Sequence, residues 1–208
     1  MPLRTFLAAW VSLCVCFPPV AQAQAQEQSG SLLGTSPDQS LAAPPVAGDQ
    51  ATFDRGTAAY DRGDFATAYQ TFSYLADRED VAAMRNVALM KRRGLGTPRD
   101  PKGAVEYLTE AAEDGLPTAQ ADLADMLLDG EAGAPDPEAA LPWLQAAASA
   151  HHPLAQFKLA EIYERGRIVP RDLAKAEALY AEAAARGVPE AATRLNLLRS
   201  GAVSPPRP

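Results

Sequence analysis

Residues 153–187, PLAQFKLAEIYERGRIVPRDLAKAEALYAEAAARG, contain the pattern that decides the fold of this chain. Ala155, Leu159 and Ile162 lie three and four residues apart, a spacing that places them on one apolar face of a helix. Gly166 follows and is expected to end that helix in the left-handed conformation that glycine adopts without strain. The stretch therefore begins with an amphipathic helix.

A second helix is predicted from Leu173 to about Arg186. Asp172 precedes it and can act as its N-cap, because the carboxylate can accept a hydrogen bond from a backbone N–H of the first turn. Alanines such as Ala176 leave room for neighbouring helices to approach closely. The stretch as a whole predicts a helix-turn-helix unit, and the fold class is all-α.

The same unit recurs toward the N-terminus at a spacing of 36 residues. Several sequence positions share this spacing, which indicates a repeat protein in which each unit covers the apolar surface of its neighbour. The repeated positions include Ala83, Ala119, Ala155 and Ala191; Val87, Leu123, Leu159 and Leu195; Gly94, Gly130 and Gly166; and Asp100, Asp136 and Asp172.

This spacing sets the expected domain organisation. Three full units are predicted at residues 80–115, 116–151 and 152–187. A helical hairpin with a shorter loop, at residues 51–79, is expected to cap one end of the stack. A lone helix at residues 188–199 is expected to cap the other, because the terminal units of a repeat stack are atypical.

The N-terminal residues 1–25 have the features of a secretory signal peptide. Arg4 precedes a predominantly apolar segment of 12 residues, and overlapping small-x-small cleavage sites follow. A retained membrane anchor is the alternative, although a spanning helix needs about 20 residues. Both cysteines lie in this leader, so the processed protein would have no thiol. We expect a periplasmic protein, with secretion as the alternative, and disorder in the linker at 26–50 and the tail at 200–208.

The charge of the chain restricts the classes of partner. The formal net charge is -7, and it becomes -8 without Arg4. Nonspecific nucleic-acid binding requires a basic surface, and anionic membrane surfaces attract basic segments. The composition therefore favours neither nucleic acid nor a membrane surface as a partner.

Three phrases carry a resemblance to a known family: AQFKLAEIYERG at 155–166, PRDLAKA at 170–176 and AAARG at 183–187. Together they resemble the SEL-1-like repeat, a relative of the tetratricopeptide repeat. The resemblance covers residues 80–199 well and 53–79 poorly. It implies an α/α superhelical solenoid in which the first helix of each unit, the A helix, lines a concave surface. It also implies protein binding, because similar bacterial members serve as periplasmic or envelope adaptors.

The sequence departs from the family pattern at two positions of the A helix. Ala88, Ala124 and Ala160 stand where the family usually has glycine. Lys91 and Leu127 stand where it usually has tyrosine. These departures predict less regular packing of the helices concerned.

The A-helix positions outside the predicted core form the candidate binding site, which we call the A-helix stripe. The stripe runs from a basic first unit through an acidic second unit to a mixed third, a pattern suited to recognition of a protein or peptide by its charges. An ordinary solvated helix face is the alternative. Its residues are Arg85, Asn86, Leu89, Arg92 and Arg93; Asp122, Asp125, Leu128 and Asp129; and Lys158, Glu161, Glu164 and Arg165.

No catalytic residue, metal ligand or cofactor is predicted. Some cysteine-rich relatives have been discussed as β-lactam hydrolases, but neither Ser73 nor Ser149 has the lysine three residues on that acylating enzymes of that kind use. The adjacent His151 and His152 lack the spacing that places two ligands on one helix face, and a polar turn is expected there.

Binding to peptidoglycan or another polysaccharide is the remaining alternative. Such binding often uses exposed aromatic rings, whereas Tyr107, Trp143 and Tyr180 fall at predicted core positions. We therefore expect a non-catalytic scaffold that binds a protein or peptide through the A-helix stripe.

Overall fold

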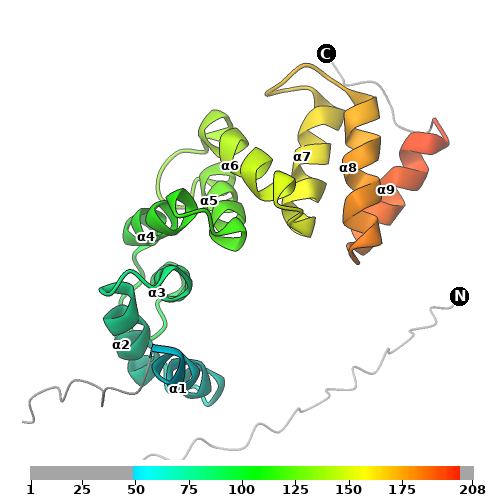
Figure 1. Cartoon of the computed structure of the whole chain (residues 1–208). Helices are drawn as coiled ribbons and strands as arrows, with labels where there is room; N and C mark the ends of the chain where they lie inside the picture. The colour runs from blue at the N-terminus through cyan, green and yellow to red at the C-terminus, as the bar shows by residue number, and fades with distance from the viewer. Residues whose placement is uncertain (1–48, 202–208) are drawn as a thin grey trace, which may run out of the picture. The chain divides into compact units, whose positions relative to one another are not determined.

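The computed structural model describes residues 49–201, and every regular element in that range is an α-helix (Figure 1). These residues belong to one compact unit, Ala42–Pro208, while the unit Met1–Leu41 lies outside the described residues. The helices are α1 (Asp49–Asp61), α2 (Phe65–Ala76), α3 (Val81–Arg93), α4 (Pro101–Glu113), α5 (Pro117–Asp129), α6 (Pro137–Ser149), α7 (Pro153–Arg165), α8 (Leu173–Ala185) and α9 (Pro189–Arg199).

The predicted leader at 1–25 lies outside the described range, as does most of the predicted linker and tail. Helix α1 begins at Asp49, so the last two residues predicted for the linker are helical. No helix between residues 49 and 201 is both long enough and apolar enough to cross a bilayer.

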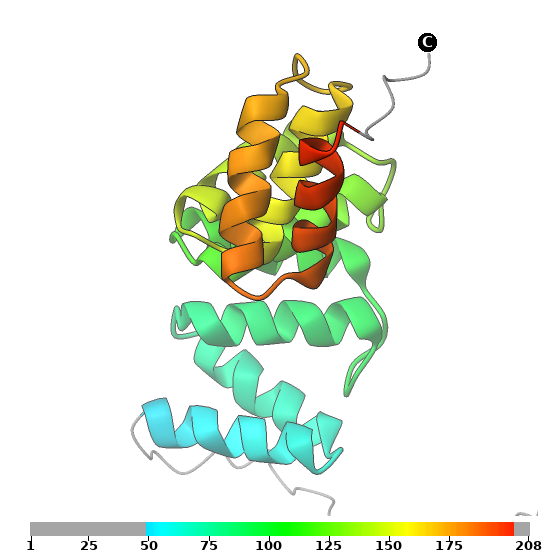
Figure 2. The same ribbon diagram turned by 90° about the vertical axis from the view of Figure 1, so that its right-hand side faces the viewer.

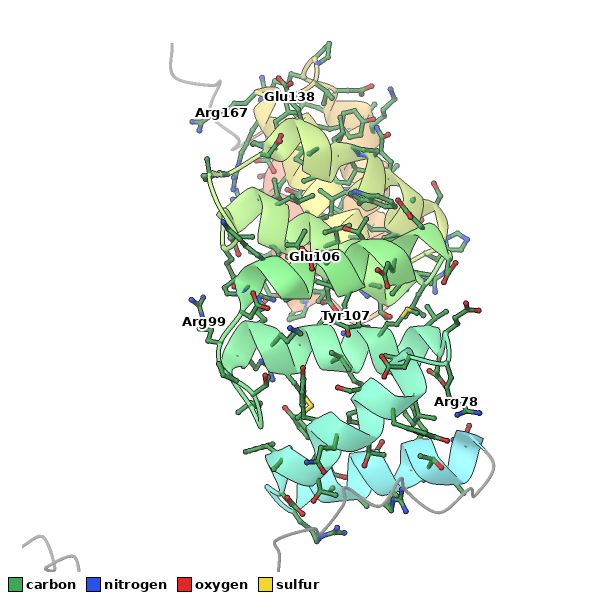
Figure 3. All side chains as sticks on the ribbon, turned by 90° about the vertical axis from the view of Figure 1, so that its left-hand side faces the viewer. Arg78, Arg99, Glu106, Tyr107, Glu138 and Arg167 are labelled. Atoms are coloured by element: carbon green, nitrogen blue, oxygen red, sulfur yellow. The ribbon has the colours of Figure 1, made fainter. Side chains whose placement is uncertain are left out.

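Each helix contacts the next one along the chain, which gives a stack of hairpins. Helices α1, α3, α5, α7 and α9 are the A helices, and α2, α4, α6 and α8 are the B helices. Figure 2 shows α8 beside α9 at the C-terminal end of the stack. In Figure 3, Arg99 and Arg167 from the loops within two units lie at one edge of the stack, and Arg78 from the turn between α2 and α3 lies at the opposite edge. The long loops and the short turns therefore occupy opposite edges.

Aspartate caps begin the B helices as the sequence predicts. The side chains of Asp100, Asp136 and Asp172 accept hydrogen bonds of 2.9, 2.9 and 3.0 Å from the backbone N–H groups of Gly103, Ala139 and Lys175. Asp64 caps α2 in the same way, at 3.2 Å from the nitrogen of Thr67, and Asp80 caps α3. These bonds satisfy N–H groups that have no partner within the helix.

The core consists of small residues with a few large side chains between them. Leu108, Leu144 and Tyr180 are fully buried, as are the repeated alanines. Tyr107 and Trp143 were predicted to lie in the core with them, but both are only half-buried. Each precedes a buried leucine in its B helix and packs against the buried core residues with only part of its surface.

Two buried glutamines join successive hairpins. Gln120 and Gln156, which are 36 residues apart, lie near the start of α5 and α7. Their Nε2 atoms donate to the carbonyl oxygens of Ala112 and Ala148, at 3.1 and 3.4 Å. These carbonyls belong to the last turn of the preceding B helix, where intrahelical donors are lacking. Each glutamine therefore ties an A helix to the end of the B helix before it.

Candidate protein-binding face

The residues of the A-helix stripe differ in exposure. Arg93, Asp129 and Arg165 are exposed, and most of the others are half-buried. Glu164 is the exception, because only 8% of the residue is accessible. Several stripe residues therefore contact other parts of the protein, and their partners determine what the stripe can bind.

Ion pairs connect the stripe residues of successive A helices. Arg85 on α3 lies 2.6 Å from Asp122 on α5, measured from Nε to Oδ2. Lys158 on α7 lies 2.5 Å from Asp125 on α5, measured from Nζ to Oδ1. The change of charge sign along the stripe, which motivated the binding hypothesis, is thus used in part to pair one repeat with the next.

Arg92 also pairs outside its own helix. Its guanidinium donates hydrogen bonds to both carboxylate oxygens of Glu131, in the loop after α5. These hydrogen bonds lower the pKa of Glu131 below its usual value. Arg92 therefore holds a loop in place, and little of its charge is left for a partner.

Glu164 points into the stack. Its Oε2 accepts a hydrogen bond of 2.6 Å from the hydroxyl of the fully buried Tyr180, and its Oε1 lies 3.5 Å from Arg194 on α9. Burial, and then this hydrogen bond, raises the pKa of Tyr180 far above its usual range. The sequence placed Glu164 on the solvent side of α7, whereas the structure makes it the acceptor that a buried phenol requires.

Two cavities lie along the stripe. The first, which we call the N-terminal cavity, has a volume of about 450 Å³ and includes four stripe residues: Arg85, Asn86, Leu89 and Arg93. The second, the C-terminal cavity, has a volume of about 410 Å³ and includes Leu128, Asp129, Lys158, Glu161 and Arg165. The structure therefore gathers most of the stripe into two hollows of a size that can hold side chains of a ligand.

Sequence reasoning missed half of the N-terminal cavity. Phe53 and Tyr60 come from α1, Phe72 from α2, and Leu116 and Thr118 from the start of α5. The loop between α1 and α2 is shorter than its counterparts, so the residues of α1 fall outside the 36-residue register that located the stripe. Phe53 and Tyr60 are seven residues apart and so lie on one face of their helix, and this spacing could have indicated that they belong to the same apolar surface.

No group of three or more His, Cys, Asp or Glu side chains that could hold a metal ion occurs within the described range. His151 and His152 form the turn before α7, with His151 at a positive φ of 60°. His152 caps α7, because its Nδ1 accepts from the backbone nitrogen of Ala155 at 3.4 Å. The polar turn expected from the sequence is thus present, and its second histidine has a structural role.

Comparison with known families agrees with this architecture. The Sel1 repeat model matches three consecutive segments, residues 81–116, 117–152 and 153–188. The chain belongs to the Sel1 repeat family. Sel1 proteins are typically non-catalytic scaffolds of a kind used in protein–protein interaction. The family assignment and the all-α superhelical solenoid predicted from the sequence are both confirmed.

Solved structures resemble this Sel1 protein over most of its described length. A Sel1 repeat protein from Oxalobacter formigenes is 35% identical, with a TM-score of 0.56 over 60% of this chain and 94% of that one. The protein c5321, a protective antigen present in uropathogenic Escherichia coli strains, is 26% identical, with a TM-score of 0.68 over 75% of this chain. This Sel1 protein spans about a third, 34%, of c5321.

A third structure, that of the MamA protein, shares the fold alone, at 20% identity and a TM-score of 0.50 over 74% of this chain and 82% of that one. A comparison with curated proteins finds no match. The solved relatives therefore identify the scaffold, while the residues that contact a partner have to be argued from this chain.

Proposed function

We propose that this Sel1 protein is a non-catalytic scaffold of the bacterial cell envelope that holds a protein or peptide against the A-helix stripe. The observation that carries the proposal is the position of the two cavities, because each is built around residues of the stripe. The features of residues 1–25 that are typical of an exported protein support the location.

The unpaired residues of the stripe give it its binding capacity. The side-chain amide of Asn86 forms no hydrogen bond within residues 49–201, and it can both donate and accept. Leu89 is half-buried in the N-terminal cavity. Asp129 is exposed at the C-terminal cavity and forms no ion pair within the described range. These side chains can contact a partner without breaking the pairs that hold the repeats together.

Reversing the charges of Asp122 and Asp125 is a poor test of this face. Each carboxylate pairs with a cation on a neighbouring repeat, so a lysine there would face Arg85 or Lys158. Such a variant would weaken the stack and the binding site together.

Site-specific photo-crosslinking in cells tests the proposal directly. A photo-crosslinking amino acid placed at Leu89 or at Asp129 should capture a protein partner. The same amino acid at Glu106 or at Glu138, which are exposed on the B helices, should capture none (Figure 3). Equal capture from both sides, or capture from the B helices alone, would contradict the proposed face.

The location is tested separately. Expressed from its full sequence, the protein should be recovered in the periplasmic fraction without residues 1–25. A variant made without these residues should stay in the cytoplasm. Recovery of the full-length, unprocessed chain in the cytoplasm would refute an envelope role.

A further inference from the structure

The floor of the N-terminal cavity is apolar and aromatic. Phe53 on α1 and Phe72 on α2 pack edge to face, with their ring centroids 5.3 Å apart. Leu89 and Met90 on α3 and Leu116 before α5 complete the floor. Such a surface favours an apolar side chain, because burying it removes hydrocarbon from water.

The rim of the cavity is basic. The residues that line it include two arginines and no acidic residue. Arg93 is exposed; its Nη1 donates to the hydroxyl of Tyr60 at 3.3 Å, and it has no carboxylate partner within the described range. Arg85 uses Nε for Asp122, and its side chain remains 30% exposed. The cavity therefore combines an apolar floor with cations and the unpaired amide of Asn86.

We propose that the N-terminal cavity binds a short acidic peptide segment that inserts one apolar side chain. This inference rests on the proposed function and specifies the chemistry of the partner. The apolar side chain contacts the pair of phenylalanines, and a carboxylate on the peptide pairs with Arg93. Arginine suits this role because its planar guanidinium can donate two parallel hydrogen bonds to one carboxylate. The amide of Asn86 can pair with the peptide backbone.

Charge over the whole chain supports a short segment as the ligand. The protein is acidic, with a formal net charge of -7, so a long polyanion would be repelled outside the cavity. The volume of about 450 Å³ holds a few side chains rather than an extended surface. A basic hollow on an acidic protein selects a local acidic segment and orients it as it approaches.

The test uses the full chain purified from cells and a random short-peptide library displayed on phage. The peptides enriched on the wild-type protein should be acidic and should carry one leucine, phenylalanine or tryptophan. The affinity of the most enriched peptide, measured by fluorescence anisotropy, should fall at least about tenfold in Arg93→Glu, because like charges that face each other oppose binding. Leu89→Glu should weaken the same peptide as strongly, because it places a charge over the apolar floor.

Arg186→Glu is the matched control. Arg186 is also an exposed arginine, but it lies at the end of α8, outside the cavity. Arg186→Glu changes the net charge of the protein by the same amount as Arg93→Glu. It should keep the wild-type affinity for the peptide to within about twofold, since the charge it alters lies far from the ligand. Thermal unfolding of the three variants checks that each remains folded.

Three outcomes would overturn the inference: no enriched peptide, enriched peptides that are neutral or basic, or an affinity that Arg93→Glu leaves unchanged. Photo-crosslinking separates this failure from that of the proposed function. Capture of a protein at Asp129 together with a failed peptide test leaves the scaffold role standing and removes the acidic ligand. Peptide binding that depends on Arg93, without capture at either position in cells, supports the cavity and refutes the cellular role.

Discussion

Lys91 stands where the family pattern has a tyrosine, and in the structure it contacts two residues that follow it in the same repeat. Its Nζ lies 2.9 Å from Oδ2 of Asp100 and 5.9 Å from the ring centroid of Tyr107 on α4. In the third repeat the tyrosine is kept as Tyr163 on α7, and Lys175 on α8 lies 5.2 Å from its ring centroid. The first and third repeats thus each place a lysine near a tyrosine of the facing helix, with the lysine on the A helix in the first repeat and on the B helix in the third.

Gly103 lies against the pair of Lys91 and Asp100. A Cβ atom at this position would lie 2.3 Å from Oδ2 of Asp100 and 2.9 Å from Nζ of Lys91. Both atoms are the ends of flexible side chains and can move aside, at the cost of the pair between Lys91 and Asp100. We therefore expect Gly103→Ala to raise the free energy of unfolding by less than the ~0.5–1 kcal/mol that the better helix propensity of alanine gives alone. Urea denaturation measures the change.

Two further variants separate the clash from helix propensity. Lys91→Ala releases the carboxylate of Asp100, so Gly103→Ala should give the full gain from helix propensity in that background. Ala139 occupies the same position in the second repeat, and Ala139→Gly should cost about 0.5–1 kcal/mol from propensity alone. An equal gain from Gly103→Ala in the wild type and in the Lys91→Ala background would show that the pair of Lys91 and Asp100 does not constrain this position.

At the scale of the helix, α7 differs from α3 and α5 because a histidine side chain caps its first turn. Nδ1 of His152 accepts the capping hydrogen bond from Ala155, which only the neutral imidazole can do. Burial lowers the pKa of His152, although the nearby charges of Asp122 and Asp125 oppose that shift and Arg85 adds to it. The cap is therefore sensitive to pH.

The lowered pKa fixes the sign of this effect. A histidine that is harder to protonate in the folded state contributes stability above its unfolded pKa of about 6.5, and that stability is lost as the pH falls. We expect the wild type to lose more stability between about pH 7.5 and pH 5.5 than His152→Asn, whose side chain caps a helix without titrating in that range. Equal losses in the two proteins, measured by urea denaturation, would exclude this source of pH dependence.

The helices themselves could be predicted closely, and particular residues explain why. The caps at Asp100, Asp136 and Asp172 and the left-handed Gly166 act within one turn of chain, so their effect can be read from neighbouring residues. The buried state of Glu164 could not be predicted in this way, because it depends on the hydroxyl of Tyr180 on another helix.

The candidate site was predictable only where the repeat register extends. Asn86, Leu89 and Arg93 were located because their helix obeys the 36-residue spacing, and they do line a cavity. Phe53 and Phe72, which form its floor, lie in the capping hairpin with the shortened loop. The 36-residue spacing therefore locates the cavity residues that lie in the regular repeat, but not those that lie in the irregular capping hairpin.

On the scale of the whole stack, the A helices are linked by charges and the hairpins by small core residues. Arg194 on α9 continues the series of pairs, with Nη2 3.8 Å from Glu161 on α7. Single pairs at partly exposed positions contribute only about 0–1 kcal/mol each. The cohesion of the stack therefore comes mainly from burial, while the ion pairs select how one A helix lies against the next.

Burial in the central repeat leads to a prediction for the stack as a whole. Leu123 on α5 is 1% exposed and belongs to the core cluster that extends from α1 to α5, while Ala124 beside it belongs to the cluster that it forms with α6 and α7. Leu123→Ala should lower the free energy of unfolding by about 2–5 kcal/mol, as truncation of a buried leucine does. Because each repeat is stabilised by both neighbours, amide hydrogen exchange should accelerate in α3 and α4 as well as in α6 and α7.

Leu195 is the matched control, because it occupies the same repeat position on the terminal helix α9 and is 9% exposed. Leu195→Ala should cost less than Leu123→Ala, and faster exchange should be confined to α8 and α9, which have no neighbour beyond them in the described part of the chain. Equal costs at the two positions, or faster exchange in α3 and α4 after Leu195→Ala, would mean that the stack unfolds as one unit, without the nearest-neighbour coupling that its contacts predict.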